Sequence, residues 1–152
     1  MKSTRSKRKV AAPPRQAIQG ELSLPHEGRY FDLKDIFDRL NQRFFRNALR
    51  RYTITWGRKR KLRPKRFFVF GAIYEDERII RIHPLLDAPF VPLWYLEFVV
   101  YHEMLHAVVP DEPMPGGRRR IHTEEFLRRE RQFPHYRKAR VWEEENLGRF
   151  LR

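Results

Sequence analysis

The chain has 152 residues, which is enough for one domain that buries its own core without disulfide bonds or a structural metal. It contains no cysteine, so disulfide bonds and cysteine metal ligands are excluded, while an apolar content of 41% supports a folded body. The formal net charge of +14 favours acidic partners such as nucleic acid, although a generally basic protein without such a partner has the same composition.

Residues 1–25 are predicted to be a basic, disordered tail, and residues 26–152 one domain. The tail is rich in Lys and Arg, contains prolines and has few large apolar residues. It lacks the apolar run of a secretion signal. The apolar stretch at residues 93–109 includes too many ionisable side chains for a membrane span. We therefore expect a cytoplasmic protein without membrane contact.

An amphipathic helix is predicted to begin after Asp32, a residue type that caps helices. Apolar residues then recur at helical spacing, at Ile36, Phe37, Leu40, Phe44, Phe45 and Leu49. Three short strands are predicted next, at residues 52–56, 67–74 and 78–83, with an acidic turn joining the last two. Together they predict a small, mainly antiparallel sheet.

A strongly basic loop, from Arg58 to Arg66, separates the first two predicted strands. Such a loop is usually a solvated surface, but this one is also a candidate for contacts with DNA phosphates. The segment from Lys2 to Arg15 is the second candidate, because the first 20 residues carry six basic side chains and no acidic one.

His102-Glu103-Met104-Leu105-His106 is the most informative motif, and it lies inside the apolar stretch that we predict to be a buried helix. Residues i and i+4 lie about 40° apart around a helix, so His102 and His106 can reach one metal ion from one face. Zinc lowers the pKa of bound water to about 7, and Glu103 could accept the proton of that water. The alternative is a pair of core histidines bonded to backbone carbonyls, which leaves Glu103 unexplained.

A third ligand is expected downstream, because catalytic zinc usually has three protein ligands and one open position. Residues 111–117 are rich in Pro and Gly and predict a loop that turns the chain back. His122 follows, directly before acidic residues that are typical of a helix start, so we expect it at or near the start of a second helix. Glu124 and Glu125 are rival ligands, and a solvated histidine is the alternative for His122.

The order and spacing of the predicted helices, strands and histidines resemble those of the SprT-like zinc metalloproteases, which include Spartan-type enzymes that act on proteins crosslinked to DNA. The resemblance spans residues 31–150. The segments that carry it are Leu40-Asn41-Gln42-Arg43-Phe44-Phe45, Ile54-Thr55-Trp56-Gly57, Gly71-Ala72-Ile73-Tyr74, Ile80-Arg81-Ile82-His83-Pro84-Leu85-Leu86-Asp87, the His102 to His106 motif and His122-Thr123-Glu124-Glu125-Phe126. One departure is the missing cysteine zinc ribbon that many such proteins carry, so any DNA targeting must come from elsewhere.

The resemblance implies an α+β, zincin-like fold: an N-terminal helix, a small mainly antiparallel three-stranded sheet, a buried helix with the histidine motif and a following helix that bears the third ligand. It also implies that His102, His106 and His122 bind Zn²⁺ and that Glu103 is the general base. Either strand Gly71 to Tyr74 or strand Ile79 to Ile82 could offer an edge to a peptide substrate.

The expected function is therefore a zinc-dependent endopeptidase acting on proteins or peptides, with DNA-associated proteins as candidate substrates. The alternatives are a non-catalytic zinc-containing nucleic-acid-binding module and a metal-dependent nuclease. Three tyrosines, Tyr74, Tyr101 and Tyr136, are candidate donors to the oxyanion, and the sequence does not choose among them. His26, His83 and His135 are expected outside the metal site. Residues 142–151 are expected to form a short C-terminal packing helix.

Overall fold

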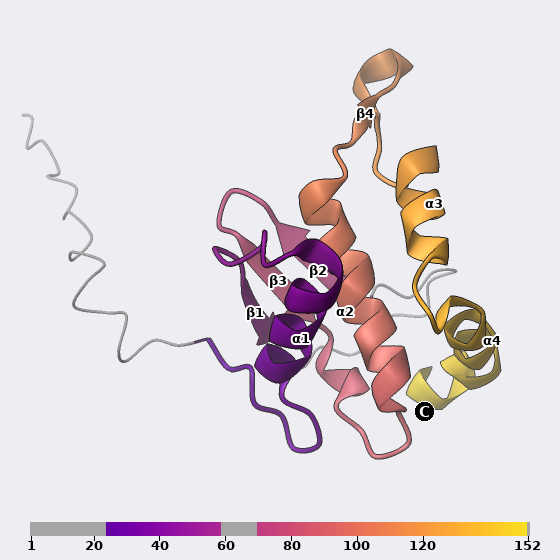
Figure 1. Ribbon diagram of the computed structural model, residues 1–152. Coiled ribbons are helices and arrows are strands. Elements are labelled where there is room, and N and C mark those ends of the chain that lie inside the picture. The colour runs from indigo at the N-terminus through magenta and orange to yellow at the C-terminus, as the bar shows by residue number, and fades with distance from the viewer. Residues whose placement is uncertain (1–23, 59–69, 152) are drawn as a thin grey trace, which may run out of the picture.

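The protein is described from a computed structural model, in which residues 24–58 and 70–151 are placed (Figure 1). This part of the chain contains four α-helices and a small mixed sheet, so the predicted α+β class is confirmed. None of its helices has the length and apolar character needed to cross a membrane.

Helix α1 (Leu33–Phe45) begins where the sequence predicts. The Asp32 carboxylate accepts a hydrogen bond from the backbone N–H of Lys34 at 2.9 Å, which confirms the predicted cap. The helix ends at Arg46 in the left-handed region, with φ 50°. Its apolar face is buried, with Ile36 and Leu40 among the buried residues, as the spacing predicts.

The three-stranded sheet has the order β1-β3-β2, formed by β1 (Thr53–Trp56), β2 (Gly71–Tyr74) and β3 (Ile79–Ile82). β2 and β3 form the predicted antiparallel hairpin, but β1 pairs with β3 in parallel. The prediction of a mainly antiparallel sheet is therefore wrong. Alternating apolar residues show that a segment is a strand and do not show in which direction its neighbour runs.

Strand β3 is the central strand, so the suggestion that Ile79 to Ile82 offers an edge to a substrate is also wrong. Both of its edges are used, one by β1 and the other by β2. Strand β2 has no second strand partner among the described residues, and it packs against helix α2. The outer edge of β2 is therefore the one that matters for the site.

Helix α2 (Leu93–Val108) lies at the centre of the molecule (Figure 1). It packs against α1 and β2 on one side and against α3 (Glu124–Arg131) and α4 (Tyr136–Asn146) on the other. Tyr95, Leu96, Val100, Met104 and Leu105 have no exposed surface, which confirms the predicted buried helix. Each such side chain contributes about 1.5–3 kcal/mol on burial, so α2 anchors the whole core.

The segment after α2 is a short antiparallel ribbon where the sequence predicts a loop. It consists of β4 (Glu112–Pro113) and β5 (Arg119–Arg120), joined through Gly116 and Gly117 with φ of 80° and 75°. Only glycine adopts such angles without strain, and these two glycines turn the chain back toward α2. The ribbon extends away from the body (Figure 1).

The C-terminal helix has other bounds than predicted. Helix α4 begins at Tyr136, six residues before the predicted start at residue 142, and it passes into a 3-10 helix, η4 (Leu147–Leu151). The C-terminal part packs through an aromatic cluster, in which Trp142 contacts Tyr95 and Phe150 contacts Phe70. This cluster fixes α4 beside α2.

Candidate metal centre

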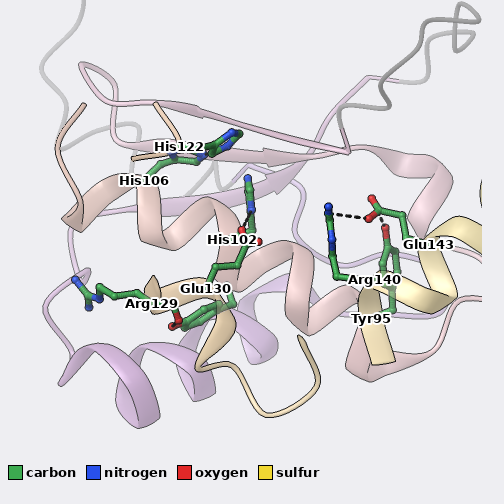
Figure 2. Close-up of polar contacts among 9 residues, drawn as sticks. Tyr95, His102, His106, His122, Arg129, Glu130, Arg140 and Glu143 are labelled. Carbon is green, nitrogen blue, oxygen red and sulfur yellow. Dashed lines mark hydrogen bonds and ion pairs between the residues drawn. The ribbon is translucent and has the colours of Figure 1, made fainter. Parts of the chain in front are cut away.

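Three histidines converge beside helix α2. His102 and His106 come from neighbouring turns of this helix, and His122 comes from the segment that precedes α3 (Figure 2). One ring nitrogen of each lies within 4.8 Å of the others, and His106 Nε2 is 3.2 Å from His122 Nε2. In a tetrahedral site with Zn–N distances of about 2.0–2.1 Å, two ligand nitrogens are about 3.4 Å apart. The group therefore has the spacing to hold a metal ion.

His122 lies near the start of a second helix, α3, as expected. Thr123 is the N-cap of α3, because its hydroxyl accepts a hydrogen bond from the Phe126 N–H at 3.1 Å, and the first helical residue is Glu124. The third histidine thus stands directly before the cap, two residues before Glu124, and the prediction that it lies at or near the start of a second helix is confirmed. The rival ligand Glu125 forms an ion pair with Arg128 at 2.6 Å, and neither it nor the exposed Glu124 belongs to the three-histidine group.

Phe126 forms an apolar platform for the three imidazoles. Its side chain is fully buried, its ring stacks on that of His106 with centroids 4.4 Å apart, and it also contacts the rings of His102 and His122. The platform restricts how far each ring can turn. It belongs to the segment quoted for the family resemblance, but the sequence alone assigns it no role.

Glu130 orients His102 from the neighbouring helix. Its carboxylate, on α3, accepts a hydrogen bond from His102 Nδ1 at 2.5 Å and is 4% exposed. This bond places the proton on Nδ1 and leaves Nε2 available to a metal ion. Burial alone would lower the pKa of His102, but the hydrogen bond to Glu130 and the negative charges of Glu103, Glu130 and Glu143 together outweigh burial, so the pKa lies above its ordinary value.

Sequence reasoning missed Glu130, although a signal was present. Thr123, Phe126 and Glu130 follow one another at the spacing of a single helix face, and all three are buried. An acidic residue on the buried face of a helix needs a partner. Here that partner is a histidine 28 residues earlier in the chain.

Glu103 lies at the buried side of the same group. The residue is 7% exposed, and burial raises the pKa of its carboxyl group to about 7. Strand β2 approaches it very closely: a Cβ atom at Gly71 would lie 2.7 Å from Glu103 Cγ. A larger residue at position 71 would therefore displace either the strand or the carboxylate.

The other two histidines are neutral at physiological pH. Burial lowers the pKa of His106 to about 4, and the positive charges of His102 and His122 act in the same direction. Burial likewise lowers the pKa of His122, with further lowering by the charges of His102 and Arg140. Neutral imidazoles are the form that binds metal ions.

A cleft of about 1090 Å³ opens over this group. Residues 71–73 of the edge strand β2 form one wall, and residues of α4 form another. Apolar side chains line part of it, namely Phe98, Val99, Ile121, Leu127 and Leu147. The three histidines and Glu103 therefore face a space large enough for several residues of a peptide.

The three tyrosines proposed from the sequence do not line this cleft. Tyr74 is 45% exposed and carries the guanidinium of Arg81 on its ring. Tyr101 is buried and donates to the carbonyl oxygen of Arg129, and Tyr136 packs against Phe98. The structure therefore does not support an oxyanion role for any of the three.

The remaining histidines lie outside the three-histidine group, as expected. His26 Nδ1 donates to Asp32 at 2.8 Å, and with Glu27 these residues form a second cluster whose ligand atoms lie within 4.8 Å of one another. Asp32 is also the cap of α1, so the cluster joins the segment before the helix to its first turn. His83 Nδ1 accepts the N–H of Leu85, and the ring of His135 contacts Trp94.

Both candidate DNA-binding segments, Lys2 to Arg15 and Arg58 to Arg66, lie outside the described residues except for the exposed Arg58. Comparison with models of known protein families, with curated proteins and with solved structures gives no match for this chain. The function must therefore be argued from the site itself.

Proposed function

We propose that this chain is a zinc-dependent endopeptidase of zincin-like architecture, related to the SprT-like metalloproteases. The observation that carries the proposal is a buried carboxylate, Glu103, beside a three-histidine group at the base of an open cleft. A purely structural metal centre would need neither the carboxylate nor the cleft.

Zinc suits the donor set. His102, His106 and His122 would hold it through three imidazole nitrogens, with the cleft on the remaining side. When bound, zinc makes water more acidic and polarises a carbonyl group. Glu130 fixes the tautomer of His102, so one ligand is oriented before the metal arrives.

Glu103 would move the proton in the reaction. Its carboxylate accepts a proton from water as the water oxygen bonds to the carbonyl carbon of the substrate. The same proton then passes to the leaving nitrogen as the C–N bond breaks, so the products are a carboxylic acid and an amine. Burial raises the pKa of this carboxyl group, which favours its protonated form after the transfer and so helps it to return the proton to the leaving nitrogen.

The edge strand β2 would align the substrate. An extended peptide can add to an unpaired strand edge through backbone hydrogen bonds, which gives little selectivity for side chains. Gly71, Ala72 and Ile73 all line the cleft, and Gly71 touches Glu103. A peptide along this edge would therefore pass directly over the general base.

The cleft disfavours the nuclease alternative. Five carboxylates line it apart from Glu103 and Glu130, against a single arginine among the described residues; they are Glu75, Asp76, Asp111, Glu143 and Glu144. They would repel a phosphodiester backbone. DNA contact, if it directs the protease to DNA-associated proteins, belongs to the basic segments Lys2 to Arg15 and Arg58 to Arg66 and not to the cleft.

The test is Glu103→Gln, which keeps the shape of the side chain and removes the base. We expect zinc content to stay at one ion per chain while cleavage of an unfolded protein slows by about 10²–10⁴-fold, the usual contribution of a general base. Glu124→Gln, an exposed carboxylate near His122, is the matched control and should cleave at the wild-type rate. Wild-type cleavage by Glu103→Gln would disprove the proposed mechanism.

A further inference from the structure

The cleft has one side chain suited to hold the substrate carbonyl. Among the described residues that line it, Arg140 is the only side chain besides the histidines that carries an N–H donor. In peptide hydrolysis, negative charge develops on the carbonyl oxygen, and a donor placed there in advance stabilises the transition state. The tyrosines considered for this role from the sequence lie elsewhere.

Arg140 is held by a chain of two hydrogen bonds that ends in the core. Its Nη1 donates to Glu143 Oε2 at 3.2 Å, and the Tyr95 hydroxyl donates to Glu143 Oε1 at 3.3 Å (Figure 2). Tyr95 is fully buried, so its hydroxyl has a fixed position. A surface arginine paired only with a neighbour on its own helix would lack this anchor.

The anchor ties Arg140 to the same helix face as the metal ligands. Tyr95 precedes His102 by seven residues on α2, which is two helical turns, so the two side chains lie about 20° apart around the helix. Arg140 itself lies on α4, which packs against α2. The positive charge of Arg140 also acts on His122, one of the three histidines, and lowers its pKa.

The charge balance indicates which ligand Arg140 takes. The guanidinium has five N–H donors, and Glu143 is its one hydrogen-bond partner among the described residues. Glu143 takes one of these N–H groups, so the others remain for an acceptor in the cleft. A neutral carbonyl oxygen that becomes negative during the reaction gains most.

We infer that Arg140 donates a hydrogen bond to the carbonyl oxygen of the peptide bond under attack, and that Glu143 and Tyr95 position it for this task. The inference rests on the proposed peptidase function. Arg140 is then a catalytic residue, while Glu143 and Tyr95 are positioning residues that act through it.

Arg140→Ala separates this role from simple binding. We expect kcat to fall by about 10²-fold, the lower end of the loss when one oxyanion donor is removed, while KM stays within twofold. Arg140→Lys should recover part of the rate. Arg137→Ala is the matched control, because Arg137 is exposed on the same helix and does not line the cleft. Zinc content and thermal unfolding should equal those of the wild type in all three variants.

Binding gives a readout that does not depend on turnover. A phosphinic peptide, whose tetrahedral phosphorus group imitates the transition state, should bind zinc-loaded Arg140→Ala about 10²-fold more weakly than wild type. The unmodified substrate peptide, measured in the Glu103→Gln background to prevent cleavage, should bind equally well with and without Arg140→Ala. Equal phosphinic peptide binding, or a loss confined to KM, would overturn the inference.

The positioning residues are tested by their dependence on Arg140. Tyr95→Phe keeps the buried ring and removes the hydroxyl, so we expect a several-fold loss of kcat without a change in KM. Combined with Arg140→Ala, it should add nothing, because the two residues act as one unit. Additive losses would show that Tyr95 does not act through Arg140. Full cleavage by Glu103→Gln would instead overturn the proposed function, and this inference with it.

Discussion

The two sides of helix α2 use polar side chains in different ways. On the side of α1, the charged side chains of the helix and its cap pair with near neighbours and are largely exposed, such as the Asp32 cap and the Lys34–Asp38 pair four residues apart. On the side of α3 and α4, polar groups are buried and joined across long sequence distances, as in His102–Glu130 and Tyr95–Glu143. Buried polar groups cost free energy unless they are satisfied, so their concentration on one side marks the site.

This difference predicts that substitutions on the α3 and α4 side change the metal centre, while those on the α1 side change stability alone. The largest effect is expected for His122→Ala. Loss of one of three ligands should reduce zinc content from one ion per chain to near zero after dialysis, as measured by elemental analysis. His135→Ala, an exposed histidine outside the group, is the control. An intact zinc content in His122→Ala would remove His122 from the site.

A smaller effect is expected for Glu130→Gln, which leaves all three ligands in place. Without the carboxylate, His102 loses the partner that fixes its tautomer, and zinc affinity should fall by about 10–100-fold. Competition with a chelator of known affinity measures this change. Glu125→Gln on the same helix is exposed and should have no effect. Equal affinity in both variants would mean that Glu130 only fills space.

The smallest effect is expected on the other side of α2, for Asp32→Ala. Loss of the helix cap should lower the free energy of unfolding by about 1 kcal/mol and leave zinc affinity unchanged. Denaturant unfolding, followed in the zinc-free and zinc-loaded protein, measures both. A change in zinc affinity would contradict the division between the two sides.

The Asp32 prediction also has a pH dependence. Burial would raise the pKa of this carboxyl group, but the hydrogen bonds from His26 and from the backbone of Lys34 and Asp35, together with the charge of His26, outweigh burial and hold the pKa below its ordinary value of 3.8. The folded state therefore binds fewer protons than the unfolded state in this range, so its stabilisation is present above pH 3.8 and is lost as pH falls through the folded-state pKa. The difference between wild type and Asp32→Ala should shrink accordingly at acid pH.

Sequence patterns predicted the elements well and their pairing poorly. The cap at Asp32, the buried face of α1 and the buried helix α2 follow from local periodicity, which is a property of neighbouring residues. The parallel pairing of β1 with β3 does not follow from local periodicity, because it depends on where the chain returns after β2. The ribbon after α2 was missed because two-residue strands leave no alternation to detect.

The sequence by itself determined that His102, Glu103 and His106 share one buried helix, because residues four apart on a helix always lie on one face. Tertiary structure alone decided which distant groups meet them. His122 and Glu130 lie at the site because α3 packs along α2, and Gly71 lies there because β2 packs against α2. Arg140 lies there because Tyr95 and an aromatic cluster hold α4 in place. These contacts are set by the packing of whole helices and strands, to which every buried side chain contributes. No short sequence motif encodes that packing.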